Sequence, residues 1–257
     1  MDFLFDGLKE AVRLIASGDR QILDAALRTL SISLSAVALA ILIGLPIATC
    51  LARRRFFGHR LLLVMFRAAL GVPTVFLGLL CFGLLARRGP LGPLDLLYTP
   101  SAIVIGETLL ALPIVVALAH GALVTLDHRI PETARTLGAG PGRRLLTYLS
   151  EARTGLILAI LTAFARCSTE LGIAMMVGGN IKDRTRTLST ATALETGRGE
   201  FADGLAMGGL MLLLATVVLV RAYSRNFGDT SDYSESNKSG AIAARLSRTA
   251  RSCAGLA

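Results

Sequence analysis

The stretch LSISLSAVALAILIGLPIATCL, residues 30–51, contains no charged side chain. A helix needs roughly 20 mainly apolar residues to cross the hydrocarbon core of a bilayer. These residues therefore predict a membrane-spanning helix. Gly44 and Pro46 lie near its far end, where they can bend the helix because both weaken regular helical hydrogen bonding.

Four further apolar stretches have the length, or nearly the length, of a membrane span. The chain is 53% hydrophobic and only 18% charged, and its mean hydropathy of +0.61 fits a bilayer better than water as the surrounding solvent. We therefore expect an all-α integral membrane protein of about five transmembrane helices. The further spans are predicted at residues 61–85, 103–124, 155–177 and 205–220.

The two ends of the chain differ from this apolar middle. Residues 1–28 place apolar side chains at helical spacing with charged ones between them, which predicts an amphipathic helix on the membrane surface. The chain does not open with the basic segment of a secretory signal, so we expect no cleaved leader. Residues 226–257 are polar without an apolar period and predict a flexible cytoplasmic tail. Residues 29–225 form the predicted transmembrane domain.

The net charge of +9 is spread between the spans instead of forming one patch, which argues against a nucleic acid partner. Cytoplasmic loops of membrane proteins are enriched in Lys and Arg. Their distribution here predicts an N-terminus outside and a C-terminus inside the cell. The basic residues placed inside include Arg53, Arg54, Arg55, Arg60, Arg129, Arg135, Arg143, Arg144, Arg153, Arg221 and Arg225; those placed outside are Arg87, Arg88, Lys182, Arg184, Arg186 and Arg198.

The longest predicted inside loop, residues 127–153, contains the signals of a short helix. Pro131 suits the first helical position, Glu132 suits the positive end of the helix dipole, and Gly138 can adopt the left-handed conformation that ends a helix. Ala134 and Gly138 leave little side chain on this helix, so another protein could approach it closely. An ordinary capped turn between two spans has the same signals, and these residues alone leave both interpretations open.

Glu132-Thr133-Ala134 followed by Gly138 resembles the Glu-Ala-Ala and downstream Gly motif of binding-protein-dependent ABC importer permeases with the type I fold. In that family the motif forms a coupling helix that seats in a separate ATPase subunit. The resemblance implies this role for Glu132, Ala134 and Gly138. Thr133 stands where the family usually has Ala, and Tyr148-Leu149-Ser150-Glu151 departs from the Ile-x-Leu-Pro element that often follows.

Arg166 and Glu170 are four residues apart in the fourth predicted span, so they would share one face of a helix. Ionisable side chains at membrane depth are unfavourable unless they pair or face water. The two residues either line a polar translocation path or form an ion pair that fixes helix packing.

This span ends with Gly178-Gly179-Asn180-Ile181, and Thr185-Arg186-Thr187-Leu188 follows. Backbone amides, hydroxyls and a guanidinium therefore lie within one short segment. Such donors bind oxyanions, although a solvated loop with a glycine break uses the same residue types. Together with Glu170, the segment resembles the tungstate, molybdate and sulfate branch of the permease family, and its tungstate members most of all. The residues expected to contribute to the translocation path are Arg166, Glu170, Gly179, Asn180, Thr185, Arg186 and Thr187.

The chain has no phosphate-binding Gly-x-x-x-x-Gly-Lys sequence, so we expect no cofactor in it and ATP bound by a partner ATPase. Its four cysteines lie singly, without the spacing of a metal site. The resemblance implies a non-enzymatic permease that imports an oxyanion, tungstate above all, with molybdate or sulfate as alternatives. It further implies an extracytoplasmic binding protein, a second copy of the chain and a bacterial inner membrane with its lipid. A passive anion channel and a membrane enzyme are the other classes considered.

Overall fold

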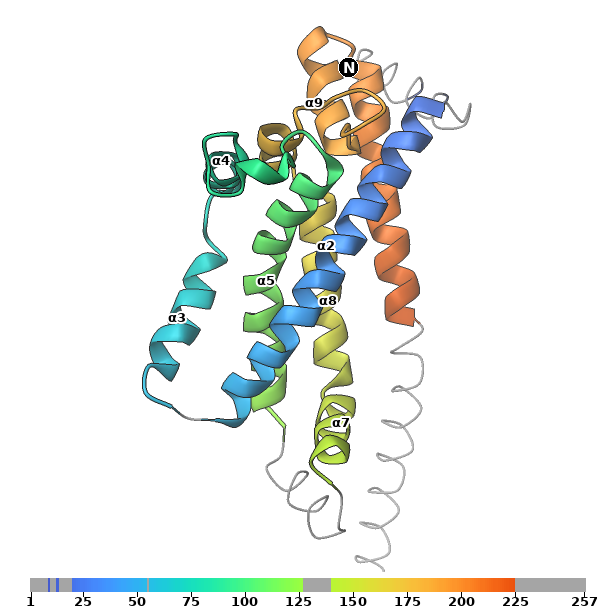
Figure 1. Ribbon diagram of the computed structural model, residues 1–257. Helices are drawn as coiled ribbons and strands as arrows, with labels where there is room; N and C mark the ends of the chain where they lie inside the picture. The colour runs from blue at the N-terminus through green and yellow to red at the C-terminus, as the bar shows by residue number, and fades with distance from the viewer. Residues whose placement is uncertain (1–8, 10–12, 14–19, 55, 127–139, 225–257) are drawn as a thin grey trace, which may run out of the picture. The chain divides into compact units, whose positions relative to one another are not determined.

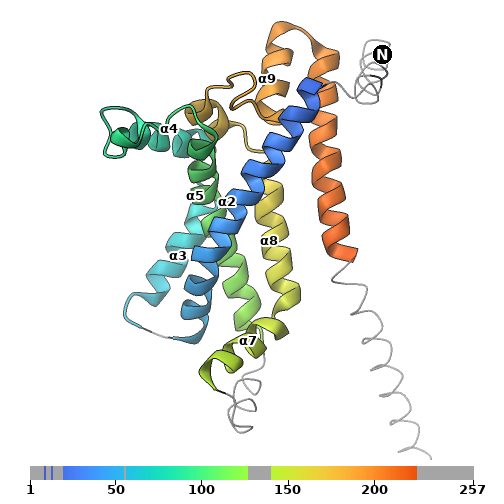
Figure 2. The ribbon, with the colours of Figure 1, turned by 45° about the vertical axis from the view of Figure 1, so that its right-hand side comes forward.

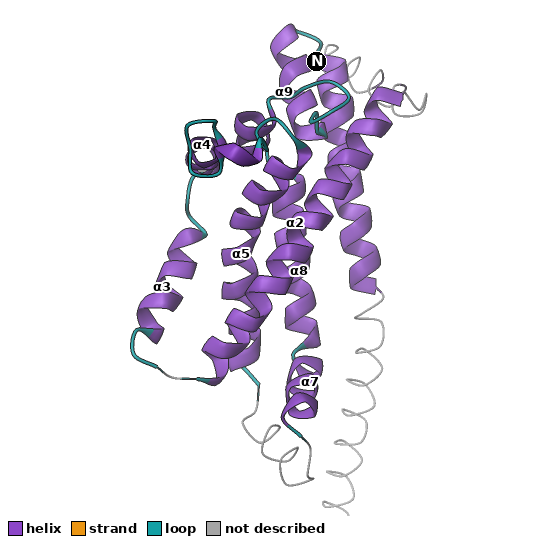
Figure 3. Ribbon diagram, viewed as in Figure 1, coloured by secondary structure: helices purple, strands orange, loops and turns teal. Residues whose placement is uncertain are grey.

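The structure is a computed structural model that describes residues 9, 13, 20–54, 56–126 and 140–224. Within these residues the chain is helical and contains no strand (Figure 3). The contacts divide it at Ala215, and the helical bundle described below belongs to the first unit, Met1–Ala215. The helices are α2 (Arg20–Arg53), α3 (His59–Ala69), α4 (Thr74–Leu85), η1 (Gly92–Leu94), α5 (Pro100–Val124), α7 (Pro141–Glu151), α8 (Arg153–Ser168), the π-helical turn η2 (Ala174–Gly178), α9 (Leu188–Arg198) and a last helix, Phe201–Ser224.

Three of the described helices are long and apolar enough to cross a membrane, namely α2, α5 and Phe201–Ser224. Two further crossings are possible as bent pairs. Helices α3 and α4 meet at 104°, and Gly142–Glu151 of α7 meets α8 at 71°. Counting each pair once gives up to five spans in the described residues, which confirms the predicted all-α membrane fold.

Three spans differ from their predicted ranges by more than a few residues at an end or by a break within the span. Helix α2 begins at Arg20, well before residue 30, and the second span is broken at Gly71-Val72-Pro73. Proline has no N–H to continue the ladder of α3, and Pro73 instead occupies the N-cap of α4. The fourth span ends at Ser168 rather than at residue 177, because the chain leaves the helix there and re-enters a π-helical turn, η2.

Helices α2, α5 and α8 lie side by side in both views of the bundle (Figures 1 and 2). Small buried residues recur once per turn along α2: Ala36, Ala40, Gly44 and Ala48. A Cβ atom on Gly44 would lie 3.2 Å from a methyl group of Val115, so the two backbones are close. In a membrane such close packing replaces the hydrophobic effect as the force between helices.

Separate apolar clusters fix the two ends of the bundle. At the end that holds η2, Ile173 and Val177 pack with Cys81 and Ile103 of α4 and α5. At the other end Tyr148 of α7 packs among residues of α2 and α5. This second end, drawn at the bottom of Figure 1, also carries Arg53 at the end of α2.

Candidate functional site

Arg166 and Glu170 form an ion pair at the end of α8. Nη1 of Arg166 donates to Oε2 of Glu170 over 2.8 Å, and Oε1 of Glu170 accepts from the backbone N–H of Ile173 at 3.1 Å. The Glu170 side chain is 1% exposed, whereas that of Arg166 is 40% exposed. The contact expected from the spacing is therefore present. Glu170 does not lie on the helix, however, since α8 ends at Ser168.

A second buried carboxyl, that of Glu107 on α5, lies close enough to Glu170 for the two to interact electrostatically. Ser33 of α2 neighbours the Glu107 carboxyl, and Sγ of Cys167 donates to the backbone oxygen of Glu107 at 3.7 Å. Among the described residues, neither Oε2 of Glu107 nor Oγ of Ser33 has a hydrogen-bond partner. Helices α2, α5 and α8 thus each bring polar atoms to one buried region.

The segment after η2 is a turn closed by its own hydrogen bonds. The Thr185 hydroxyl donates to the backbone oxygen of Gly178 at 2.6 Å and accepts from the N–H of Ile181 at 2.9 Å. Gly179 has φ +70, and a Cβ there would lie 2.7 Å from the Tyr98 ring, so the turn requires glycine. The donors expected to meet an oxyanion therefore also hold the turn together.

Arg186 and Asn180 are hydrogen-bonded within this turn, and Arg28 and the cap of α9 connect the turn to neighbouring helices. Nε of Arg186 donates to Oδ1 of Asn180 at 3.3 Å, and Nη1 of Arg28 on α2 donates to the backbone oxygen of Arg186 at 3.0 Å. Thr187 caps α9, accepting from the N–H of Thr190 at 3.3 Å. The turn is thus anchored to α2 at one point and begins α9 at another.

The seven predicted path residues consequently fall into two groups. Arg166 and Glu170 join the buried region around Glu107, and Asn180, Thr185, Arg186 and Thr187 build the turn together with Gly179. Glu170 links the groups, because its backbone oxygen accepts from the hydroxyl of Ser189 at 2.7 Å. Sequence reasoning missed Arg28 and Ser33. Ser33 could have been found as a hydroxyl within an uncharged membrane span. No feature of the sequence around Arg28 indicates its contact with the turn.

The predicted coupling residues Glu132, Ala134 and Gly138 lie outside the described residues. The elements on either side of them are described. Helix α5 ends at Val124 and α7 begins at Pro141, and the Tyr148 hydroxyl donates to the backbone oxygen of Leu123 at 2.7 Å. The segment between the two helices thus starts and ends on elements that are hydrogen-bonded together.

The chain is similar in sequence to several permeases of uptake systems. It is 38% identical to the tungstate uptake system permease protein TupB of Campylobacter jejuni over 84% of this chain and 90% of that protein. It is 30% identical to TupB of Peptoclostridium acidaminophilum over 87% and 98% of the two chains. It is 32% identical to the molybdenum transport system permease protein ModB of Azotobacter vinelandii over 76% and 90%. No family model matches.

Among solved structures, an inward-facing form of the MetNI methionine ABC transporter contains a chain with the same fold. The TM-score is 0.61 at 18% identity, and the match covers 76% of this chain and 90% of that one. At this identity the likeness concerns the fold alone.

Proposed function

This chain belongs to the permease subunits of ABC importers, in the branch of the tungstate and molybdenum uptake systems, and we propose that it forms the membrane path of a tungstate importer. The observation that carries the proposal is the 38% identity to a tungstate permease over 84% of the chain. Up to five membrane-crossing segments support it, since a path across a bilayer must be built from such segments. Molybdate is the second candidate cargo because a molybdenum permease also matches.

Energy and cargo would reach the chain through other subunits. Membership of the family implies an ATPase and a substrate-binding protein as partners. The chain itself would bind no cofactor and catalyse no reaction, since ATP would bind to the ATPase. We place it in a bacterial inner membrane with its N-terminus outside and its C-terminus in the cytoplasm.

The path would lie between two copies of the chain. Helix α3 supports this, because none of its residues is buried. Its Leu61, Val64 and Met65 side chains are each about 60% exposed, the outcome expected for a face covered by lipid or by a second copy.

Glu132, Ala134 and Gly138 would seat in the ATPase and transmit its closure. The flanking contacts support this route. Tyr148 ties α7 to α5, and α8 begins at Arg153, directly after α7. A displacement of the coupling segment would therefore reach α5 and α8 together, and through α8 the Arg166–Glu170 pair.

Arg166 would contact the passing oxyanion. Its side chain is 40% exposed, and guanidinium groups bind oxyanions with paired hydrogen bonds. Glu170 beside it would limit the affinity, which suits transport because an ion held too tightly does not leave. The outer end of the path would be shaped by the turn that contains Gly179, Asn180, Thr185, Arg186 and Thr187.

Replacing Gly138 with tryptophan tests the docking role. The full chain is reconstituted in vesicles with its ATPase and binding protein, and tungstate uptake and tungstate-stimulated ATP hydrolysis are measured. We expect the Gly138→Trp variant to insert in the membrane in normal amount and to lose both activities, since a bulky side chain would keep the two surfaces apart.

A matched control is Gly140→Trp, which places the same side chain two residues away, where a Cβ would meet no atom of the described residues within 4 Å. This control is expected to keep most of the uptake. Normal uptake by Gly138→Trp would refute the docking role. In the same vesicles, competition by unlabelled molybdate against tungstate uptake would show which of the two anions the importer prefers.

A further inference from the structure

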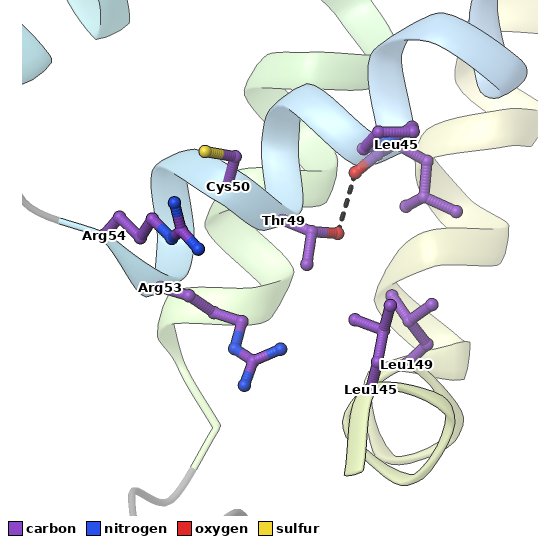
Figure 4. Close-up of a pocket in the computed structure, with 8 residues that line it drawn as sticks. Leu45, Thr49, Cys50, Arg53, Arg54, Leu145 and Leu149 are labelled. Carbon is purple, nitrogen blue, oxygen red and sulfur yellow. Dashed lines mark hydrogen bonds between the residues drawn. The ribbon is translucent and has the colours of Figure 1, made fainter. Parts of the chain in front are cut away.

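A pocket of about 570 Å³ lies between the end of α2 and α7. Figure 4 shows its walls, with Arg53 at the end of α2 and Arg54 directly after it on one side, and the leucines of α7 on the other. We call it the inner pocket. The residues that line it are Leu45, Pro46, Thr49, Cys50, Arg53, Arg54, Leu145 and Leu149.

The positive charge of the inner pocket comes from Arg53 and Arg54. The guanidinium carbon of Arg53 lies 5.9 Å from the centroid of the Tyr148 ring, a cation–π contact that holds this side chain beside α7. Within the described part of the chain, neither arginine forms an ion pair with a carboxylate. Their charge is therefore available to a ligand with negative charge.

Apart from Thr49, whose hydroxyl donates to the backbone oxygen of Leu45 at 2.7 Å, the rest of the pocket is apolar, and Leu45 and Pro46 lie deeper along α2. Leu45 and Arg53 are eight residues apart in one helix, a separation of about 12 Å along its axis. Leu145 and Leu149 supply the facing wall from α7. A small oxyanion would use only the arginine end, whereas an amphiphile with an anionic head and an acyl chain would use both ends.

We propose that the inner pocket binds an anionic phospholipid, with its phosphate between Arg53 and Arg54 and an acyl chain along Leu45, Leu145 and Leu149. Basic pockets between helices at a membrane surface bind lipid headgroups in this way. The apolar part of α2 ends at Leu51, so the two arginines lie at headgroup depth. The proposal goes beyond the import function and requires only that α2 crosses the bilayer.

The bound lipid would act as a bridge between two elements. It would join α2 to α7, the helix that follows the proposed coupling segment. Anionic lipid would thus stabilise one position of α7 relative to the bundle, and the lipid composition of the membrane would influence how the coupling segment is presented.

Cys50 provides a reporter because it lines the inner pocket and is exposed, whereas Cys81 and Cys167 are buried. The full chain carrying Cys253→Ser is placed in nanodiscs of phosphatidylcholine alone or mixed with phosphatidylglycerol. The rate of Cys50 modification by N-ethylmaleimide is then measured. We expect phosphatidylglycerol to slow the modification by at least fivefold, since a basic residue contributes about fivefold to binding at an anionic surface.

The variant Arg53→Gln/Arg54→Gln should lose this protection, and Arg53→Lys/Arg54→Lys should keep most of it. Both arginines are exposed, so neither exchange disturbs the core. The matched control Arg87→Gln/Arg88→Gln removes the same charge at exposed positions in another loop and should keep the protection. Comparing the two lipid mixtures within each variant removes any general effect of surface charge on the thiol.

Two outcomes would overturn the proposal. One is an equal rate of Cys50 modification in both lipid mixtures for the chain that keeps Arg53 and Arg54. The other is protection by soluble phosphate or tungstate in phosphatidylcholine nanodiscs, which would assign the inner pocket to a free anion instead. The assay contains neither ATPase nor binding protein, so its result is independent of the uptake experiment.

Discussion

At the scale of the residue, the Arg166–Glu170 pair is asymmetric. Water reaches Arg166, which is 40% exposed, and not Glu170, which is 1% exposed. Removing one partner of a buried pair leaves the other charge without compensation. Without Glu170, the Arg166 side chain could turn toward water or headgroups. Without Arg166, the Glu170 carboxylate would keep the N–H of Ile173 as its hydrogen-bond donor among the described residues.

We therefore predict that Arg166→Gln lowers stability more than Glu170→Gln does. The free energy of unfolding is expected to fall by about 3 kcal/mol for Arg166→Gln. It is expected to fall by about 1 kcal/mol for Glu170→Gln, because glutamine preserves an acceptor for the N–H of Ile173. The measurement is thermal unfolding of the purified chain in detergent.

The double variant Arg166→Gln/Glu170→Gln is the control. It leaves no buried charge at this position and should be more stable than Arg166→Gln alone. Equal losses from the two single variants would contradict the asymmetry.

At the scale of the element, close packing of α5 and α8 depends on a glycine. A Cβ atom on Gly155 would collide with the Cβ of Ala122. Gly155 lies in the first turn of α8, directly after the 71° bend from α7. The contact thus holds α8 against α5 where motion from the coupling segment would enter.

Gly155→Ala is expected to push the two helices apart and to lower stability by about 1–3 kcal/mol, the usual effect of overpacking. Reconstituted uptake should fall with it, because α8 would no longer follow α5. Thermal unfolding and tungstate uptake are the two measurements.

Gly121→Ala is the matched control on α5, since a Cβ there would meet no atom within 4 Å in the part of the chain that the structure describes. Alanine favours a helix by about 1 kcal/mol over glycine, so this variant should be at least as stable as the original chain. A Gly155→Ala protein of unchanged stability and uptake would show that the helices separate without consequence.

At the scale of the whole molecule, the basic residues gather at the two ends of the bundle. Arg53 and Arg54 follow the apolar part of α2, and the turn after η2 carries Lys182 and Arg184 at the other end. The proposed orientation puts the Arg53 end in the cytoplasm, where the ATPase would dock. It puts the turn outside, where the binding protein would deliver its anion.

Thiol labelling with a membrane-impermeant maleimide tests this orientation. In a Cys253→Ser background, Cys50 should react in inverted vesicles, at a rate slowed by bound anionic lipid, and stay unlabelled in intact cells. A cysteine introduced as Lys182→Cys, with Cys50→Ala, should show the opposite pattern because position 182 is exposed at the other end. Labelling of Cys50 from outside would show that the orientation is the opposite of the proposed one. The coupling segment would then lie outside the cell, where a cytoplasmic ATPase could not reach it.

Much of the fold could be predicted from local composition. The uncharged stretch at residues 30–51 lies wholly within α2, and each other predicted span overlaps a described helix. The predicted roles of individual residues agreed less well with the structure. The Arg166–Glu170 contact was expected from helical spacing and is present although Glu170 lies beyond the end of α8. Thr185 and Thr187, expected on the translocation path, use their hydroxyls to close a turn and cap a helix. A hydroxyl in a sequence does not reveal which acceptor it will meet.

The sequence by itself determined that the chain is a membrane bundle with a motif of the importer family, because apolar length and short-range spacing are local properties. Tertiary structure alone decided where the spans break and which polar groups meet. The chain leaves α8 after Ser168 where Ser189, distant in sequence, binds the Glu170 carbonyl, and Arg28 reaches Arg186 across the bundle. Such contacts depend on helices being packed together, and no local pattern encodes them.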